Sequence, residues 1–142
     1  LTAAGAYPLT VAAAGAGLVH SQALTLTVTD FALAATPAAR TIPHGQSAVY
    51  TVTLTSLAGF AQAVALDVAG VPAGATAEWS QNPAAPDGQS VLTVQTSSET
   101  PAGLCPLTLT GAAAGLTRSQ TVTLRACEAI TNSPCHELRT AR

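Results

Sequence analysis

Apolar and polar residues alternate along most of this chain, which is the pattern of β-strands whose side chains point to opposite faces in turn. The alternation is clearest from Gln46 to Thr55, where it runs without interruption. Similar segments recur at intervals of roughly ten residues, separated by turns that contain Gly and Pro, and no helical period is present. The pattern predicts an all-β chain with two packed antiparallel sheets.

The chain contains one long internal repeat, and each copy is a pair of alternating segments joined by an Ala/Gly turn. Pro8 returns as Pro106 and Thr25 as Thr123, a shift of 98 positions without a gap. Such a pair of segments is typical of a β-hairpin. A period of this length indicates tandem β domains, because the units of solenoid repeats are about 20–50 residues long.

We therefore predict three parts: the C-terminal β-hairpin of a preceding repeat at 1–29, a complete domain at 30–126 and a Cys-containing tail at 127–142. A two-stranded hairpin alone is marginally stable in water. Its apolar face therefore requires cover, either from sequence upstream or from another chain. Because the chain begins with Leu1 rather than Met, we expect a processed product or a fragment of a longer protein.

The complete domain is predicted to hold seven strands around a thin, mainly aliphatic core. Its first strand ends at Pro37, which suits an edge position, and a turn is expected at 42–45. Pro8 and Pro106 fall where a central strand needs an N–H donor, so either pairing begins after them or a bulge absorbs each one. The positions predicted to point into the core are Tyr50, Val52, Leu54, Val64, Leu66, Trp79, Leu92, Val94, Leu107, Leu109, Val122 and Leu124.

The charge of the chain limits its partners. Only 8% of the residues are charged, the net charge is −2, and the five basic residues are all Arg. Nucleic acids and anionic membranes are bound by clustered cations, so we expect neither partner. No apolar run approaches the roughly 18 residues that a membrane span needs, so membrane insertion is not expected.

Residues that could support catalysis are few and scattered. His20 and His44 share no ligand spacing and are interpreted as exposed residues. The carboxylates are isolated, and no serine lies in a nucleophile motif, so neither an enzyme nor a cofactor is predicted. Trp79 and Tyr50 would form a sugar-stacking platform only if they faced outward, but the alternation of Trp79 with Ala77 places it in the core.

The tail contains two of the three cysteines. We predict a disulfide between Cys127 and Cys135, which would close a short loop worth roughly 2–3 kcal/mol. Two other hypotheses use His136 as well: a haem-attachment site with unusually wide spacing, and a zinc site that lacks a fourth ligand. Cys105 is expected to point into the core as a small apolar residue, with pairing to a tail cysteine or another chain as the alternative.

Residues 31–125 resemble a bacterial immunoglobulin-like (Ig-like) repeat domain of secreted and cell-surface proteins, and residues 1–29 resemble the end of a preceding copy. The matching motifs encode turns and core positions, so they are specific to the fold and carry no active site. They are Asp30-Phe31-Ala32-Leu33, Ser47-Ala48-Val49-Tyr50-Thr51-Val52, Val71-Pro72-Ala73-Gly74-Ala75-Thr76-Ala77, Asn82-Pro83 and Thr100-Pro101-Ala102-Gly103.

The resemblance implies a seven-stranded antiparallel Ig-like β-sandwich, preceded by a β-hairpin from an adjacent repeat, in an extracellular or cell-surface location. The function it implies is that of a non-catalytic structural or spacer module. Its expected partners are neighbouring Ig-like domains or copies of itself, bound through strand edges as in fibre assembly. The alternative is a carbohydrate-binding accessory module of a secreted hydrolase.

Overall fold

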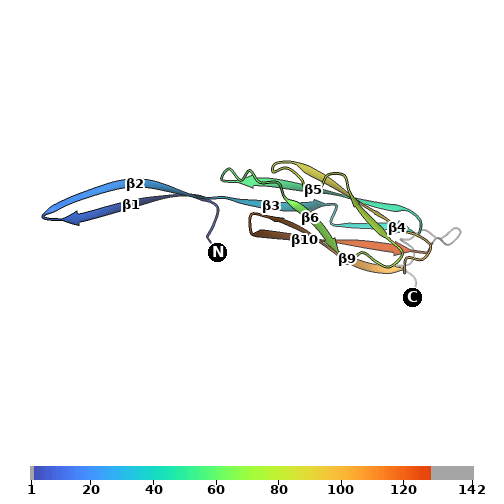
Figure 1. Cartoon of the computed structure of the whole chain (residues 1–142). Helices are drawn as coiled ribbons and strands as arrows, with labels where there is room; N and C mark the ends of the chain where they lie inside the picture. Colours follow the sequence, from blue (N-terminus) through green and yellow to red (C-terminus); the bar gives the residue numbers. More distant parts are fainter. Residues whose placement is uncertain (1, 129–142) are drawn as a thin grey trace.

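The computed structural model describes residues 2–128, and the described chain is all β, with strands and loops only (Figure 1). A two-stranded hairpin extends from one end of a two-sheet sandwich. The strands are β1 (Gly5–Gly15), β2 (Leu18–Val28), β3 (Asp30–Thr36), β4 (Ala39–Pro43), β5 (Ser47–Leu57), β6 (Ala65–Ala69), β7 (Thr76–Trp79), β8 (Gln89–Gln95), β9 (Gly103–Ala113) and β10 (Leu116–Cys127).

The sandwich is built from one sheet of order β3-β5-β8-β7 and a second of order β4-β10-β9-β6. This is the ABED and CFG arrangement of an Ig-like fold, with β4 added as a further edge strand beside β10. The all-β sandwich predicted from the alternation is therefore confirmed. Its strands number eight rather than seven, because the chain crosses between the sheets after β3 and pairs again as β4, where only a turn was expected.

The β4–β10 pair also departs from the expected antiparallel arrangement. Thr123 pairs with Ala39 and Cys127 with Pro43, so the two strands run parallel. Ile42 points inward from β4 and is buried, with 8% of its surface exposed. The backbone N–H of His44 then donates to the carbonyl of Cys127 at 2.9 Å, which joins the ends of the two strands.

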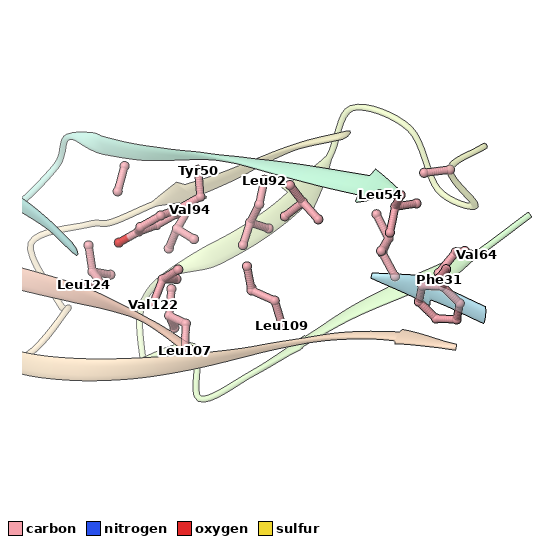
Figure 2. Close-up of a cluster of buried hydrophobic side chains, with 14 of the residues drawn as sticks. Phe31, Tyr50, Leu54, Val64, Leu92, Val94, Leu107, Leu109, Val122 and Leu124 are labelled. Atoms are coloured by element: carbon pink, nitrogen blue, oxygen red, sulfur yellow. The ribbon is translucent and has the colours of Figure 1, made fainter. Parts of the chain in front are cut away.

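The core lies between the two sheets, and the alternation of β5 shows how the sequence builds it. Its inward side chains are buried, while the intervening Val and Thr are partly exposed. The residues predicted from the pattern are buried in the structure except Trp79, which is partly buried at the end of the short edge strand β7. Phe31, which the pattern did not single out, lies at one end of the core (Figure 2). Its ring packs against that of Phe60, with ring centroids 5.2 Å apart.

Pro106 sits inside β9 without a bulge, so both sequence-based explanations for it are wrong. The register against β10 is continuous, with Pro106 opposite Thr123, and Pro8 lies opposite Thr25 in the same way. The carbonyl of Pro106 points toward Gly70, beyond the end of the β6–β9 pairing. In an antiparallel strand the backbone N and O of one residue point to the same side. The N–H that Pro106 lacks would therefore also point toward Gly70, where β9 has no partner strand.

Tyr50 connects the two sheets from inside the core. Its hydroxyl donates to the carbonyl of Thr123 at 2.9 Å, which joins β5 to β10. Burial raises the pKa of Tyr50 from 10.0 to about 12, against a smaller opposing effect of Arg40. The phenol therefore stays protonated, as a donor, over the whole neutral range.

We expect Tyr50→Phe to lower the free energy of unfolding by about 0.5–1.5 kcal/mol at pH 7, because the hydrogen bond from the buried Tyr50 to the Thr123 carbonyl is lost. A raised pKa means that the folded state holds its proton more tightly, so native stability should fall as pH rises from 10 toward 12. Tyr50→Phe should remove that contribution. Urea denaturation between pH 7 and 11.5 measures both effects, with Tyr7→Phe on the hairpin as control. If the unfolding free energy of Tyr50→Phe falls with rising pH above 10 as steeply as that of the unchanged protein, the raised pKa does not belong to Tyr50.

Candidate functional site

The hairpin β1–β2 has the same construction as β9–β10, displaced by 98 residues. Tyr7 pairs with Leu26, and the equivalent pair in the sandwich is Cys105 with Leu124. The turns agree as well: φ is 52° at Ala16 and 78° at Gly17, against 51° and 79° at the equivalent residues Ala114 and Gly115. The sequence repeat is therefore a repeat of register and turn geometry.

One face of the hairpin is apolar and open to solvent. We call it the apolar face and define it as Leu9, Val11, Leu24 and Leu26, whose exposed fractions are 46%, 56%, 49% and 48%. The equivalent residues of β9–β10 are 0% exposed, and they are Leu107, Leu109, Val122 and Leu124. Both sets contain three Leu and one Val. The apolar side chains that β9–β10 turns toward the core are thus matched on the hairpin, without the opposite sheet.

Both edges of the hairpin are open too. In the sandwich β9 pairs with β6 and β10 pairs with β4, whereas β1 and β2 pair only with each other among the described strands (Figure 1). Unpaired strand edges and an apolar sheet face are the features that recruit further strands. The hairpin is therefore the candidate functional site, and its chemistry is that of a strand-pairing surface.

The junction between the hairpin and the sandwich is short and tied down. β2 ends at Val28 and β3 begins at Asp30, which leaves Thr29 as the single connecting residue. The Asp30 carboxylate accepts a hydrogen bond from the backbone N–H of Phe31 at 2.7 Å and forms an ion pair with Arg118 of β10. The hydrogen bond from Arg118 is the main reason that the pKa of Asp30 lies below its usual value of 3.8.

We expect Asp30→Asn to lower the free energy of unfolding by a few tenths to about 1 kcal/mol at pH 7, as is usual for ion pairs near a surface. Because the pKa of Asp30 is lowered in the folded state, the contribution is present above its usual value of 3.8 and disappears as pH falls below it. Denaturation at pH 7 and pH 2 tests this. Asp67→Asn, at a carboxylate that forms no ion pair with the described residues, is the control. If Asp30→Asn loses as much unfolding free energy at pH 2 as at pH 7, its effect does not come from the charge of Asp30.

The predicted cysteine and histidine sites lie mostly at the end of the described chain. Cys127 is buried at the end of β10, but Cys135 and His136 lie outside the described residues, so the disulfide stays a prediction and the haem and zinc hypotheses stay untested. Cys105 is a free thiol that packs against the core. Residues 2–128 contain no group of three His, Cys, Asp or Glu side chains placed to hold a metal ion.

The two histidines of the described chain lie in different environments. His20 is exposed on β2, as expected. His44 is partly buried, so its interpretation as an exposed residue is wrong, and its Nε2 has no hydrogen-bond partner within residues 2–128. The cause is the contact of its backbone with Cys127, which holds it against the end of the sandwich. In the same residues no helix is long and apolar enough to cross a bilayer.

Solved structures similar to this chain include several of the S-layer protein SbsC. A crystal structure of SbsC domains 4 and 5 gives a TM-score of 0.53 at 17% sequence identity, over 84% of this chain and 65% of that chain. The crystal structure of rSbsC(31-844) gives a TM-score of 0.55 at 16% identity, over 93% of this chain and 17% of that chain. A structure of SbsC domains 4–9 gives a TM-score of 0.53 at 15% identity, over 90% of this chain and 19% of that chain. No protein-family model and no curated protein matches the sequence.

This chain therefore spans less than two thirds of the length of those S-layer structures. At such identities the likeness concerns the fold alone. Together with the strand order it defines the class of the protein, an all-β chain with an Ig-like β-sandwich.

Proposed function

We propose that the chain is a non-catalytic structural or spacer module of a secreted or cell-surface protein, built from Ig-like domains in tandem. The observation that carries this proposal is the junction at Thr29. There a hairpin with the register of β9–β10 passes directly into the first strand of the sandwich. A one-residue connection leaves little freedom between successive domains, so a row of such modules has a defined reach and direction.

The surface location is supported by two further features. Several solved structures of similar fold are domains of an S-layer protein. The low content of charged residues, 8%, also fits a module that acts through its shape and its backbone edges rather than through charge. Fibre assembly through strand edges is the more specific form of the proposal, and the edges of β1 and β2 are available for it in a chain whose hairpin has no further module to complete.

The alternative of a carbohydrate-binding module is less well supported. Sugar-binding platforms use exposed flat aromatic rings, whereas Phe31, Phe60 and Tyr50 are buried in the sandwich and Trp79 packs against its core. Tyr7 on the hairpin donates its hydroxyl to the carbonyl of Ala3 at 2.8 Å. No observation therefore favours the second function.

The test is to raise antibodies to the sandwich, residues 30–126, and to label intact cells of the source organism. Labelling before permeabilisation, together with recovery in the surface extract, is the expected result. Recovery only inside the cells would overturn the proposal. Sedimentation of the purified chain over a wide range of concentration then tests fibre assembly, for which we expect growing species, and Thr10→Lys and Thr25→Lys on the hairpin should reduce them.

A further inference from the structure

The apolar face of the hairpin fits a partner that can be identified from the sandwich itself. In the sandwich, the equivalent face of β9–β10 is covered by the sheet β3-β5-β8-β7, while β4 and β6 pair with its two edges. We propose that β1–β2 completes an Ig-like module that lies before it in the same polypeptide and supplies the strands equivalent to β3–β8. We further propose that this module differs in sequence from residues 30–99 where it contacts Ala13 and His20. The inference rests on the tandem arrangement in the proposed function.

The chain's own sandwich cannot supply the cover. Val28 is equivalent to Ala126, which pairs with Ile42 at the exit end of the sandwich. Asp30 lies at the opposite end, beside Arg118. The eight steps from Arg118 to Ala126 along the strand span about 26 Å. Thr29 alone bridges at most about 7 Å between its neighbours. The hairpin therefore cannot fold back into the place of β9–β10 of its own domain.

A second copy of residues 30–99 is also a poor fit. The inward cross-strand pairs of the two hairpins differ at several positions, and the difference with the plainest steric consequence is at Gly111, where the first hairpin has Ala13. Gly111 pairs with Arg118 in β9–β10, and Ala13 pairs with His20 in β1–β2. A Cβ at Gly111 would lie 2.8 Å from Leu33 Cδ1, 2.9 Å from Val64 Cγ1 and 3.3 Å from Phe31 Cε2. Val64 is fully buried and β-branched, so it has little room to move.

The charge at this pair differs as well. Arg118 forms an ion pair with Asp30, whereas His20 offers a shorter side chain without a guanidinium group. A partner suited to Ala13 and His20 therefore has smaller side chains at the positions of Leu33 or Val64, and no carboxylate that depends on an arginine. The apolar face can pack against the opposite sheet of Ig-like modules in general. The pair of Ala13 with His20 favours some of these modules over others. Such selection favours the correct neighbour over identical copies.

The experiment extends the full chain at its N-terminus. A second copy of residues 30–99 is joined directly to Thr2, which is equivalent to Thr100 in the repeat. The hairpin β1–β2 can then pack against a copy that contains Phe31, Leu33 and Val64. Hydrogen exchange followed by mass spectrometry reads the amides of β1–β2, and the sandwich of residues 30–127 in the same molecule is the internal reference. The variants are Ala13→Gly with His20→Arg, Ala12→Gly as control on the opposite face, and Leu24→Asn on the apolar face.

We expect β1–β2 to be more protected in the extended chain than in the chain itself. Ala13→Gly with His20→Arg should raise that protection by about tenfold or more, through relief of overpacking and a new ion pair. Ala12→Gly should not raise it, and Leu24→Asn should lower it. Unprotected β1–β2 amides in every extended chain would overturn completion of a module, and equal protection with and without the paired substitutions would overturn the selection. Neither failure touches the surface location, which the antibody experiment tests separately.

Discussion

Leu107→Ala is expected to lower the free energy of unfolding of the sandwich by about 2–5 kcal/mol. Leu107 is fully buried on β9 between the two sheets. Removing its branched side chain leaves a cavity that close-packed neighbours fill only in part. Urea denaturation should show this as a lower midpoint with an unchanged slope.

The repeat provides a matched control in the same molecule. Leu9 occupies the equivalent position on β1 and is 46% exposed. Leu9→Ala should therefore change the stability of the sandwich by less than about 0.5 kcal/mol. Similar losses from Leu9→Ala and Leu107→Ala would mean that the apolar face is covered in the isolated chain, and would contradict the open hairpin.

Gly70→Ala is expected to destabilise the sandwich by about 2–5 kcal/mol, through two effects at one position. Gly70 has a φ of 90°, in the left-handed region, which costs a residue with a side chain about 1–2 kcal/mol. An added Cβ would also overlap the carbonyl oxygen of Pro106, a backbone atom that cannot turn aside, and overpacking costs about 1–3 kcal/mol more. Thermal unfolding should show a lower midpoint.

Gly59→Ala separates these two effects. Gly59 has a φ of 80° and no atom within 4 Å of an added Cβ, so only the backbone cost of about 1–2 kcal/mol applies. We expect Gly70→Ala to be clearly the more damaging substitution. Equal losses would show that the approach of Gly70 to Pro106 carries no energetic weight.

The inward and outward faces of the strands could be predicted from the sequence because alternation is a local property. Four buried positions of β5 alternate with exposed or partly exposed ones, so one face of the strand is buried. Trp79 is less buried than expected because β7 has four residues and lies at the edge of its sheet, where a large ring is only partly covered. The alternation predicts to which face of the sheet a side chain points. It does not predict how close the strand lies to the edge of the sheet.

The features that escaped prediction depend on residues far apart in the sequence. β4 has one buried side chain, Ile42, and its partner strand β10 lies more than seventy residues away, so no local pattern marks it. The ion pair of Asp30 with Arg118 joins positions 88 residues apart. The effect of Ala13 likewise becomes visible only through the neighbours of Gly111. The repeat predicted the hairpin, and the structure was needed to show that its apolar face and both of its edges are open.

The parallel pair β4–β10 has a mechanical consequence for a module joined at both ends. The chain enters the sandwich at β3 and leaves it after Cys127 at the opposite end (Figure 1). Tension between neighbouring modules therefore pulls β4 and β10 in opposite directions along their common axis. The bonds from Ala39 to Pro43 lie across that axis, so they share the load in shear and must break together. We expect this strand pair to set the force at which the module yields.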